Sequence, residues 1–157
     1  MDIRFLRADD PPKVQEIMAA NPWQFPQRII DTYPDRWNKF LFSESNEAYG
    51  YFVADRNGEI VGHVGYIYDE SRGVYEIVGV VVKNTVQGKG IGTQLIDRVC
   101  EHVKSLGGRE VFLCTLEHPA NEMTMRFYEK LGFRATAHDV DFWGPTLNRV
   151  TYVRAVI

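Results

Sequence analysis

A glycine-rich stretch from Val86 to Gly92, VQGKGIG, lies between a valine-rich run and an amphipathic helical pattern. A helix that begins here would present backbone N–H groups without intrahelical acceptors at its positive end, which favours an anion such as phosphate. Glycines let a ligand approach the backbone because they have no Cβ atom. A tight strand-to-helix turn is the alternative, but three glycines beside Lys89 favour the anion site.

Two common phosphate-binding motifs fail on spacing. A dinucleotide-binding GxGxxG fingerprint that starts at Gly88 needs a glycine where Thr93 stands. A P-loop around Lys89 needs a glycine where Lys83 stands and a serine or threonine where Gly90 stands. The stretch therefore indicates another class of phosphate-bearing ligand.

A third pattern fits the same stretch. Gln87-x-x-Gly90-x-Gly92 resembles the Q/R-x-x-G-x-G/A signature of the GNAT superfamily, whose members transfer acyl groups from coenzyme A to amines. Further along, NEMTMRFYEKLGF at residues 121–133 resembles the downstream helix of that family and the entry to its next strand. The resemblance extends from about residue 49 to about residue 134.

The resemblance implies that acetyl-CoA is the co-substrate and that backbone atoms bind it. Its pyrophosphate would lie on the loop and the first helical turn, at Gln87, Gly88, Lys89, Gly90, Ile91, Gly92 and Thr93. Its pantetheine arm would pair, like an added strand, with the backbone of Val80, Val81 and Val82. Asn121 would contact that arm or hold the loop, and asparagine is also favoured at a helix N-terminus.

Acyl transfer to an amine needs a base, because an alkyl ammonium with a pKa near ~10 must lose a proton before it attacks. Glu76 is the candidate: it is the one charged residue of the strand-like run VYEIVGVVV, where partial burial would raise its pKa. Alternation places it on the face of Val78 and Val80. The family's histone-acetylating branch has its glutamate base at a similar spacing. The alternative is a glutamate that faces water or pairs with an arginine.

Tyr128 is the candidate acid. By resemblance it would donate a proton to the departing sulfur of coenzyme A, and the alternative is aromatic packing of an amphipathic helix, which suits the adjacent Phe127. The backbone N–H of Val80 or of a neighbouring residue would stabilise the negative charge on the acyl oxygen. Gly79 would mark a bulge that opens a slot beside the central strand.

Hydrophobic patterning predicts the elements that position these residues. Strand-like runs flank Asn57-Gly58, a strong hairpin signal, and VYEIVGVVV is expected at the centre of the sheet. Helices are expected after Asp10, within residues 22–42, from Ile91 to about residue 106, and over residues 120–131, with strands between and after them. We therefore expect one domain, residues 1–157, of the α/β class (α+β mixed). Its GNAT-like, mostly antiparallel sheet would have six to seven strands, one parallel crossover and about four flanking helices.

The acceptor, a primary amine of a small molecule or peptide, is expected among aromatic residues of the early helices, the hairpin and the last strands. These aromatic residues are Trp23, Phe25, Tyr33, Trp37, Tyr66, Tyr68, Phe142 and Trp143. The acidic residues near them are Asp69, Glu70, Asp139 and Asp141. Ring faces and carboxylates together would favour a cationic amine. The alternative is that the aromatic residues form core and the acidic residues are solvated.

Composition excludes several classes of protein. The 157 residues carry a formal net charge of −3, which does not favour a nucleic-acid surface, and no apolar run reaches a membrane-spanning length of roughly 20 residues. The charged start MDIRFLRADD does not resemble a signal peptide. Cys100 and Cys114 lack CxxC spacing, and the four histidines lack metal-ligand spacing. We expect a cytoplasmic protein without a metal, with TYVRAVI as a strand that could pair across a homodimer.

The sequence thus predicts an acetyl-CoA-dependent N-acetyltransferase that acts by direct transfer in a ternary complex. A non-catalytic acyl-CoA-binding sensor or scaffold with the same fold is the alternative, although such a module would need neither Glu76 nor Tyr128. A nucleotide-binding domain is a more remote third reading.

Overall fold

A seven-stranded sheet with the order β1-β2-β3-β4-β5-β7-β6 forms the centre of the computed structural model, which describes residues 1–157. Its strands are β1 (Asp2–Phe5), β2 (Tyr49–Arg56), β3 (Glu59–Asp69), β4 (Val74–Val82), β5 (Glu110–Glu117), β6 (Arg134–Asp139) and β7 (Asn148–Ala155). The helices are α1 (Pro11–Ala19), α2 (Gln27–Ile30), α3 (Tyr33–Leu41), α4 (Ile91–Ser105) and α5 (Glu122–Lys130). The mixed α/β class is confirmed, with five helices, one of them a single turn, where about four were expected.

The β2–β3 hairpin forms where the Asn-Gly pair predicted it. Asn57 and Gly58 have φ angles of 54° and 92°, which a tight two-residue turn requires. The Gly58 N–H donates to Asp55 Oδ1 at 2.7 Å, which closes the turn. This hairpin and the following turn lay β3 and β4 side by side, so that β4 occupies the centre of the sheet as expected.

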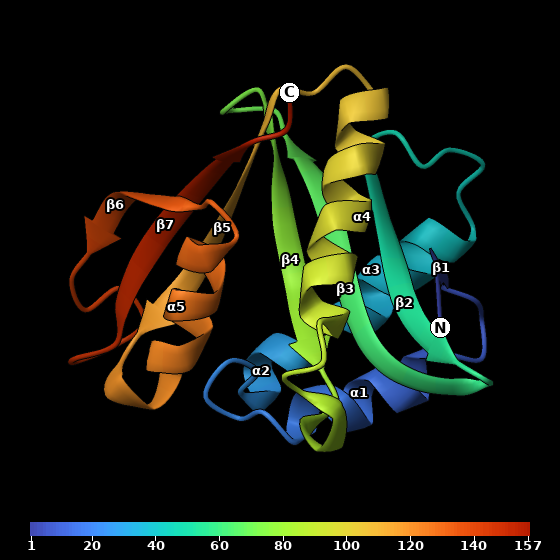
Figure 1. The fold of residues 1–157 in the computed structure, drawn as a ribbon, viewed down its shortest axis with the longest axis horizontal. Coiled ribbons are helices and arrows are strands. Elements are labelled where there is room, and N and C mark those ends of the chain that lie inside the picture. Colours follow the sequence, from blue (N-terminus) through green and yellow to red (C-terminus); the bar gives the residue numbers. More distant parts are fainter.

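Helices cover both faces of the sheet (Figure 1), and each face has its own hydrophobic core. On one face α4 contributes Leu95 and Val99, and α5 contributes Tyr128, to a core of twenty buried residues. On the opposite face α1 to α3 form a second core of twelve buried residues, which includes Met18 and Trp37. A ligand bound in a gap between two strands could therefore contact side chains from both cores.

The sheet divides between β4 and β5, its one parallel pair. Only Tyr75 with Val111 and Glu76 with Phe112 are paired, after which the two strands diverge (Figure 1). Every other neighbouring pair of strands is antiparallel. The rest of β4, from Ile77 onward, consequently has no strand partner on the β5 side.

A β-bulge at Gly79 accompanies this divergence, as the sequence predicted. Gly79 has a φ of 63°, and the register of β4 against β3 shifts between His63 and Gly65. A Cβ atom on Gly79 would lie 2.8 Å from His63 Cε1, so close packing and backbone conformation both require glycine here.

The bulge corrects one expectation about β4. Val78 packs against the core of α1 to α3, whereas Val80 packs against the core of α4 and α5. The prediction that Glu76, Val78 and Val80 share one face is therefore wrong for Val80. The extra residue of a bulge inverts the alternation beyond it, and the sequence reading had assumed uninterrupted alternation.

The last strand also differs from expectation. β7 lies between β5 and β6 and pairs with both, so TYVRAVI has no free edge on which a second chain could add a strand. The exposed edge on this side is β6. The loop between β6 and β7 places the C-terminal strand inside the sheet, between β5 and β6. The local sequence pattern of a strand does not indicate its position in the sheet.

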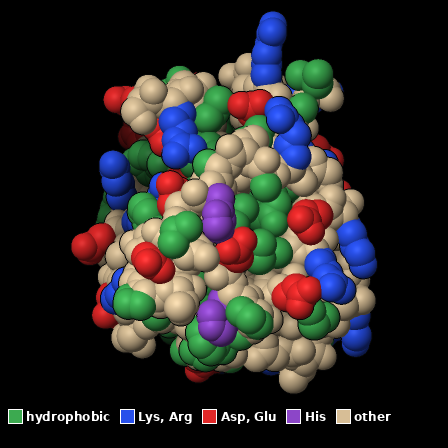
Figure 2. All heavy atoms as spheres, turned by 90° about the vertical axis from the view of Figure 1, so that its left-hand side faces the viewer, with side chains coloured by type: hydrophobic (Ala, Val, Ile, Leu, Met, Phe, Trp, Pro, Cys, Tyr) green, Lys and Arg blue, Asp and Glu red, His purple; other side chains and the backbone are tan.

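Figure 2 shows the face that carries β6, β7 and α5, where acidic, basic and apolar side chains are interspersed without a broad patch of one charge. No helix combines the length and apolar character needed to cross a bilayer.

Candidate active site

The loop before α4 presents a group of backbone donors. Gly88 and Gly90 have φ angles of 79° and 83°, and Gly90 precedes the first residue of α4. The first N–H of this helix with a carbonyl acceptor belongs to Gln94, which donates to Gly90 O at 3.1 Å. The preceding N–H groups, through Thr93, have no acceptor within the protein. A Cβ atom at Gly88 or Gly90 would meet nothing within 4 Å, so no other part of the protein packs against the loop at these two glycines.

Side chains brace this loop without filling it. Gln87 Nε2 donates to Val82 O at 3.1 Å and to Asn84 Oδ1 at 2.9 Å, which ties the loop to the end of β4. A Cβ atom at Gly92 would lie 3.0 Å from Phe127 Cζ, so this glycine lets α4 approach α5. Lys89 is exposed and forms no ion pair with the protein.

The three valines at the end of β4 face different partners. Lys83 N–H binds Val61 O of β3 at 2.8 Å, so alternation turns the backbone groups of Val81 toward β3 and those of Val82 away from it. Val82 O instead accepts the bond from Gln87. Val81 therefore has no backbone donor or acceptor for a ligand on the β5 side, in contrast to the expectation that all three valines are available.

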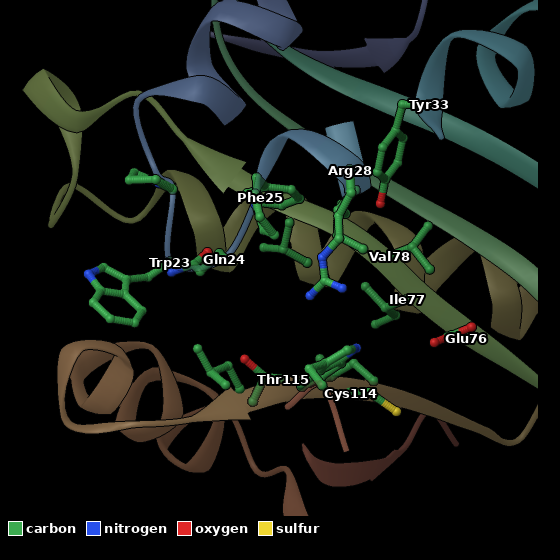
Figure 3. A pocket seen from close by; sticks show the side chains of 18 of the residues that line it. Trp23, Gln24, Phe25, Arg28, Tyr33, Glu76, Ile77, Val78, Cys114 and Thr115 are labelled. Carbon is green, nitrogen blue, oxygen red and sulfur yellow. The ribbon is translucent and has the colours of Figure 1, made fainter. Parts of the chain in front are cut away.

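A cavity of about 370 Å³ opens where β4 leaves β5 (Figure 3). Twenty residues line it, thirteen of them hydrophobic, from β4, β5, α2, α3, α5 and the loops before α2 and β7. Tyr33 of the α1–α3 core and Tyr128 of the α4–α5 core both line it. The cavity thus extends through the gap in the sheet, and its predominantly apolar wall favours exclusion of water.

Tyr128 lies in the wall of this cavity. Its ring is buried and packs against Phe133 and Tyr152, so the packing alternative is correct for the ring. Its hydroxyl, however, has no hydrogen-bond partner in the protein and is not sealed from solvent. Burial and the nearby Tyr33 raise the pKa of Tyr128 above its usual value, which keeps the phenol protonated at neutral pH.

Glu76 lies in the same cavity at the point where strand pairing ends. Its carboxylate forms no ion pair or hydrogen bond with the protein, unlike the carboxylate of Asp139, which pairs with Arg149 at 3.0 Å. Burial raises the pKa of Glu76 above its usual range, although Arg36 opposes the shift. A half-buried, unpaired carboxylate of raised pKa in a cavity is a typical candidate for a general base.

A buried histidine fixes the bulge behind this site, and the sequence analysis did not assign it a role. His63 is fully buried; its Nε2 lies 3.0 Å from Trp37 Nε1 and its Nδ1 lies 2.7 Å from Gly79 O. The indole can only donate, so Nε2 accepts and the protonated Nδ1 donates to the carbonyl. Burial lowers the pKa of His63 to about 4, consistent with this neutral tautomer.

Asn121 connects α5 to two other elements. Its Nδ2 donates to Thr115 Oγ1 at 3.0 Å and to Leu116 O at 2.6 Å, and its Oδ1 accepts from Gln24 Nε2 at 3.3 Å. Asn121 precedes α5 but its side chain caps no N–H of that helix. The side chain therefore holds the end of β5 and the loop before α2 in place beside the cavity.

The acceptor expectation is only partly matched. Trp23, Phe25, Tyr33 and Trp143 line the cavity. Trp37 and Tyr66 instead are core residues whose polar atoms bind His63 and Asn46 O. Among the acidic residues, Asp69 pairs with Arg72 and Asp139 with Arg149, so neither offers a free carboxylate.

Two further observations concern reactive side chains. Cys114 lines the cavity, but burial raises its thiol pKa and its Sγ has only Thr151 Oγ1 as a polar neighbour, at 3.5 Å. No three or more His, Cys, Asp or Glu residues gather in a group that could hold a metal ion. Arg28, which the sequence analysis did not select, extends from α2 into the cavity (Figure 3). A single arginine in a segment interrupted by prolines belongs to no motif, so the sequence did not indicate a role for Arg28.

Comparison with known proteins adds independent evidence. The family model described as Acetyltransferase (GNAT) family matches residues 14–133. An uncharacterised N-acetyltransferase of Methanocaldococcus jannaschii is 36% identical over 104 residues, which are 62% of this chain and 44% of that protein. The chain therefore spans about half the length of this relative. An L-amino acid N-acyltransferase of Escherichia coli is 28% identical over 143 residues, 87% of this chain and 81% of the relative.

A crystal structure from Desulfovibrio desulfuricans, assigned to the GNAT acetyltransferases, has a TM-score of 0.87 at 23% identity and covers 99% of both chains. This likeness shows a shared fold. Together with a family model that covers most of the sequence, including the glycine loop and α5, it establishes that the chain belongs to the GNAT family of acetyltransferases.

Proposed function

We propose that the chain is an N-acetyltransferase that moves the acetyl group of acetyl-CoA to a primary amine of a small molecule or peptide, by direct transfer in a ternary complex. The observation that carries the proposal is the divergence of β4 from β5. It produces one cavity that contains Glu76 and the Tyr128 hydroxyl, at the strand that leads to the free donors before α4.

The residues present fit an acyl-CoA. The unpaired N–H groups from Gly88 to Thr93 at the positive end of α4 suit a pyrophosphate, and exposed Lys89 adds a positive charge. The free edge of β4 suits an extended arm with amide groups, as in strand addition. We assign that role to Val80 and Val82, with Val81 packed behind them, and we assign Gln87 and Asn121 to holding the site in shape.

When bound, acetyl-CoA supplies an acyl group activated as a thioester. Glu76 takes a proton from the ammonium form of the acceptor, directly or through a water molecule, because its half-buried carboxylate is free and its pKa is raised. The backbone N–H of Val80 is the donor assigned to the acyl oxygen as it gains negative charge. The protonated Tyr128 donates to the sulfur as it leaves.

Cys114 has no role as a nucleophile in this mechanism. Its raised thiol pKa disfavours the thiolate, and no histidine is its hydrogen-bond partner. Direct transfer therefore requires no covalent acyl-enzyme. We further propose that residues 1–157 act as one domain in the cytoplasm; a homodimer remains a prediction that the oligomeric state in solution would test.

The proposal is tested by titration calorimetry with coenzyme A and by release of free coenzyme A from acetyl-CoA in the presence of a panel of amines. We expect cofactor binding and amine-dependent release. Binding without release for every amine would favour the non-catalytic sensor or scaffold. Absence of binding, or tighter binding of ATP than of acetyl-CoA, would contradict both readings.

A further inference from the structure

The cavity beside Glu76 has a simple charge inventory. Among the twenty residues that line it, Arg28 and Glu76 are the only charged ones. One fixed positive and one fixed negative charge thus lie in an otherwise apolar or neutral wall. A ligand is favoured when its own charges match both groups, with less solvent screening at the half-buried Glu76 than at the exposed Arg28.

Arg28 has no partner within the protein. Neither an ion pair nor a hydrogen bond connects its guanidinium to any side chain or carbonyl group. Two other arginines of this region are paired: Arg72 lies 3.8 Å from Asp69, and Arg149 lies 3.0 Å from Asp139. Figure 3 shows the Arg28 side chain extending from α2 across the cavity toward β5.

Further arginines lie near Glu76 outside the cavity wall. Arg36, Arg72 and Arg149 all act on its carboxyl group to lower its pKa, whereas Asp69 alone among nearby acidic residues acts to raise it. Arg72 and Arg149 are each paired with an aspartate, so Arg28 and Arg36 are the unpaired positive charges that would repel a polycationic acceptor. This differs from the cationic-amine expectation, which rested on acidic residues that the fold pairs with arginines.

On the basis of the proposed function, we propose that the acceptor is an amine that also carries a carboxylate, and that Arg28 binds this carboxylate while Glu76 faces the amine. A guanidinium forms two parallel hydrogen bonds with a carboxylate, which fixes the acceptor's orientation. A carboxylate also balances the single charge of Arg28, the one cationic side chain that lines the cavity.

The test compares acceptors that differ only in this group. Each of the common L-amino acids is assayed against its carboxamide, with release of coenzyme A as the measurement. The carboxamide has the less basic amine, so chemical reactivity alone would favour it. At least one amino acid should therefore have a kcat/KM about 10- to 100-fold higher than its amide, the range for a charge-assisted hydrogen bond.

Variants connect the preference to the residue. Arg28→Gln should raise the KM for that amino acid about 10- to 100-fold and change the KM of its amide much less, because the amide has no negative charge for Arg28 to bind. Arg28→Lys should retain part of the preference. Arg56→Gln is the matched control, because it removes an arginine at the end of β2 whose partner is Glu59. Calorimetry with the N-acetyl amino acid as product should show the same loss for Arg28→Gln alone.

The outcomes distinguish this inference from the proposed function. Acylation of amides or simple diamines at rates equal to or above those of amino acids overturns the inference and leaves the acetyltransferase intact. Faster acylation of phosphoethanolamine or glucosamine 6-phosphate overturns the choice of carboxylate. An unchanged preference in Arg28→Gln overturns the assignment to Arg28. If no amine in the panel causes release of coenzyme A, both proposals are overturned.

Discussion

The two ends of the proposed site are built from different parts of the chain. The loop before α4 offers backbone N–H groups, and side chains such as Gln87 only brace it. The cavity between β4 and β5 instead depends on side chains, with Glu76, Tyr128 and Arg28 reaching it from three elements. Binding by backbone N–H groups tolerates changes of side chain except at residues with a positive φ. Acyl transfer in the cavity instead depends on particular side-chain functional groups. Substitutions should therefore affect cofactor affinity at one end and turnover at the other.

Glu76→Gln should have the largest effect at the cavity end. Loss of the base is expected to lower kcat/KM about 100- to 1,000-fold near neutral pH, with the affinity for coenzyme A unchanged. In the wild type, activity should fall as the pH drops through the raised pKa of Glu76, because the base must be ionised. Coenzyme A release as a function of pH measures both effects, with Glu59→Gln as an exposed control.

Glu76→Gln should also change the free energy of unfolding in a pH-dependent way. Burial disfavours the ionised Glu76 in the folded state, so above its raised pKa the group lowers the free energy of unfolding. Glu76→Gln should be more stable than wild type at neutral pH. The difference should vanish below the ordinary carboxyl pKa, where both states bind the proton. A destabilised variant at neutral pH would contradict the assigned environment of Glu76.

Tyr128→Phe should rank next. A thiolate is a good leaving group, so loss of the hydroxyl is expected to lower kcat about 10- to 100-fold, toward the low end for acid catalysis. Steady-state kinetics and coenzyme A calorimetry measure the effect on turnover and on binding. Tyr152→Phe is the matched control, since it removes a hydroxyl from the same core that binds Glu129 at 3.4 Å. Equal kinetics for the two variants would remove Tyr128 from the mechanism.

The His63 support of the bulge predicts acid sensitivity. The unfolded chain binds a proton at His63 near pH 6.5, but the folded protein only near pH 4. Stability from this site is therefore fully present above pH 6.5 and should decline by about 1.4 kcal/mol for each pH unit between these values. His63→Gln retains one acceptor and one donor but does not titrate, so its urea-unfolding curves should lose this part of the slope.

Gly90→Ala tests the proposed binding of coenzyme A by the backbone N–H groups of the loop before α4. An alanine at a φ of 83° costs about 1–2 kcal/mol, so the loop should shift and coenzyme A should bind about tenfold more weakly. The pH profile of turnover should keep its shape. Gly107→Ala is the matched control: it has a φ of 88° and open space around it, but lies beyond the other end of α4. If both variants bind coenzyme A equally, the loop is not the anion site.

Lys89→Gln should have the smallest effect. Its ammonium is exposed and forms no ion pair, so coenzyme A affinity should change less than about fivefold and the change should shrink as salt increases. Binding isotherms at two salt concentrations measure it. A loss as large as that expected for Gly90→Ala would show that a side chain, rather than backbone donors, dominates this end.

The sequence revealed the backbone end far better than the cavity end, for a physical reason. Loop glycines, the Asn57–Gly58 turn and the Gly79 bulge depend on local conformation, which neighbouring residues encode. Arg28 enters the cavity only because α2 lies opposite β5, and Val80 changes face only because the bulge adds a residue. Such juxtapositions depend on how distant elements pack, and a single sequence has no local pattern for them.

The two paired positions between β4 and β5, Tyr75 with Val111 and Glu76 with Phe112, have a mechanical meaning. All other ladders lie within the four-strand part or the three-strand part. A force that separates these parts meets few backbone bonds at the seam, which makes it the first place to open. An acyl-CoA bound along the free edge of β4 would connect the two parts of the sheet. The protein should therefore become more rigid when it binds this substrate, without any moving lid.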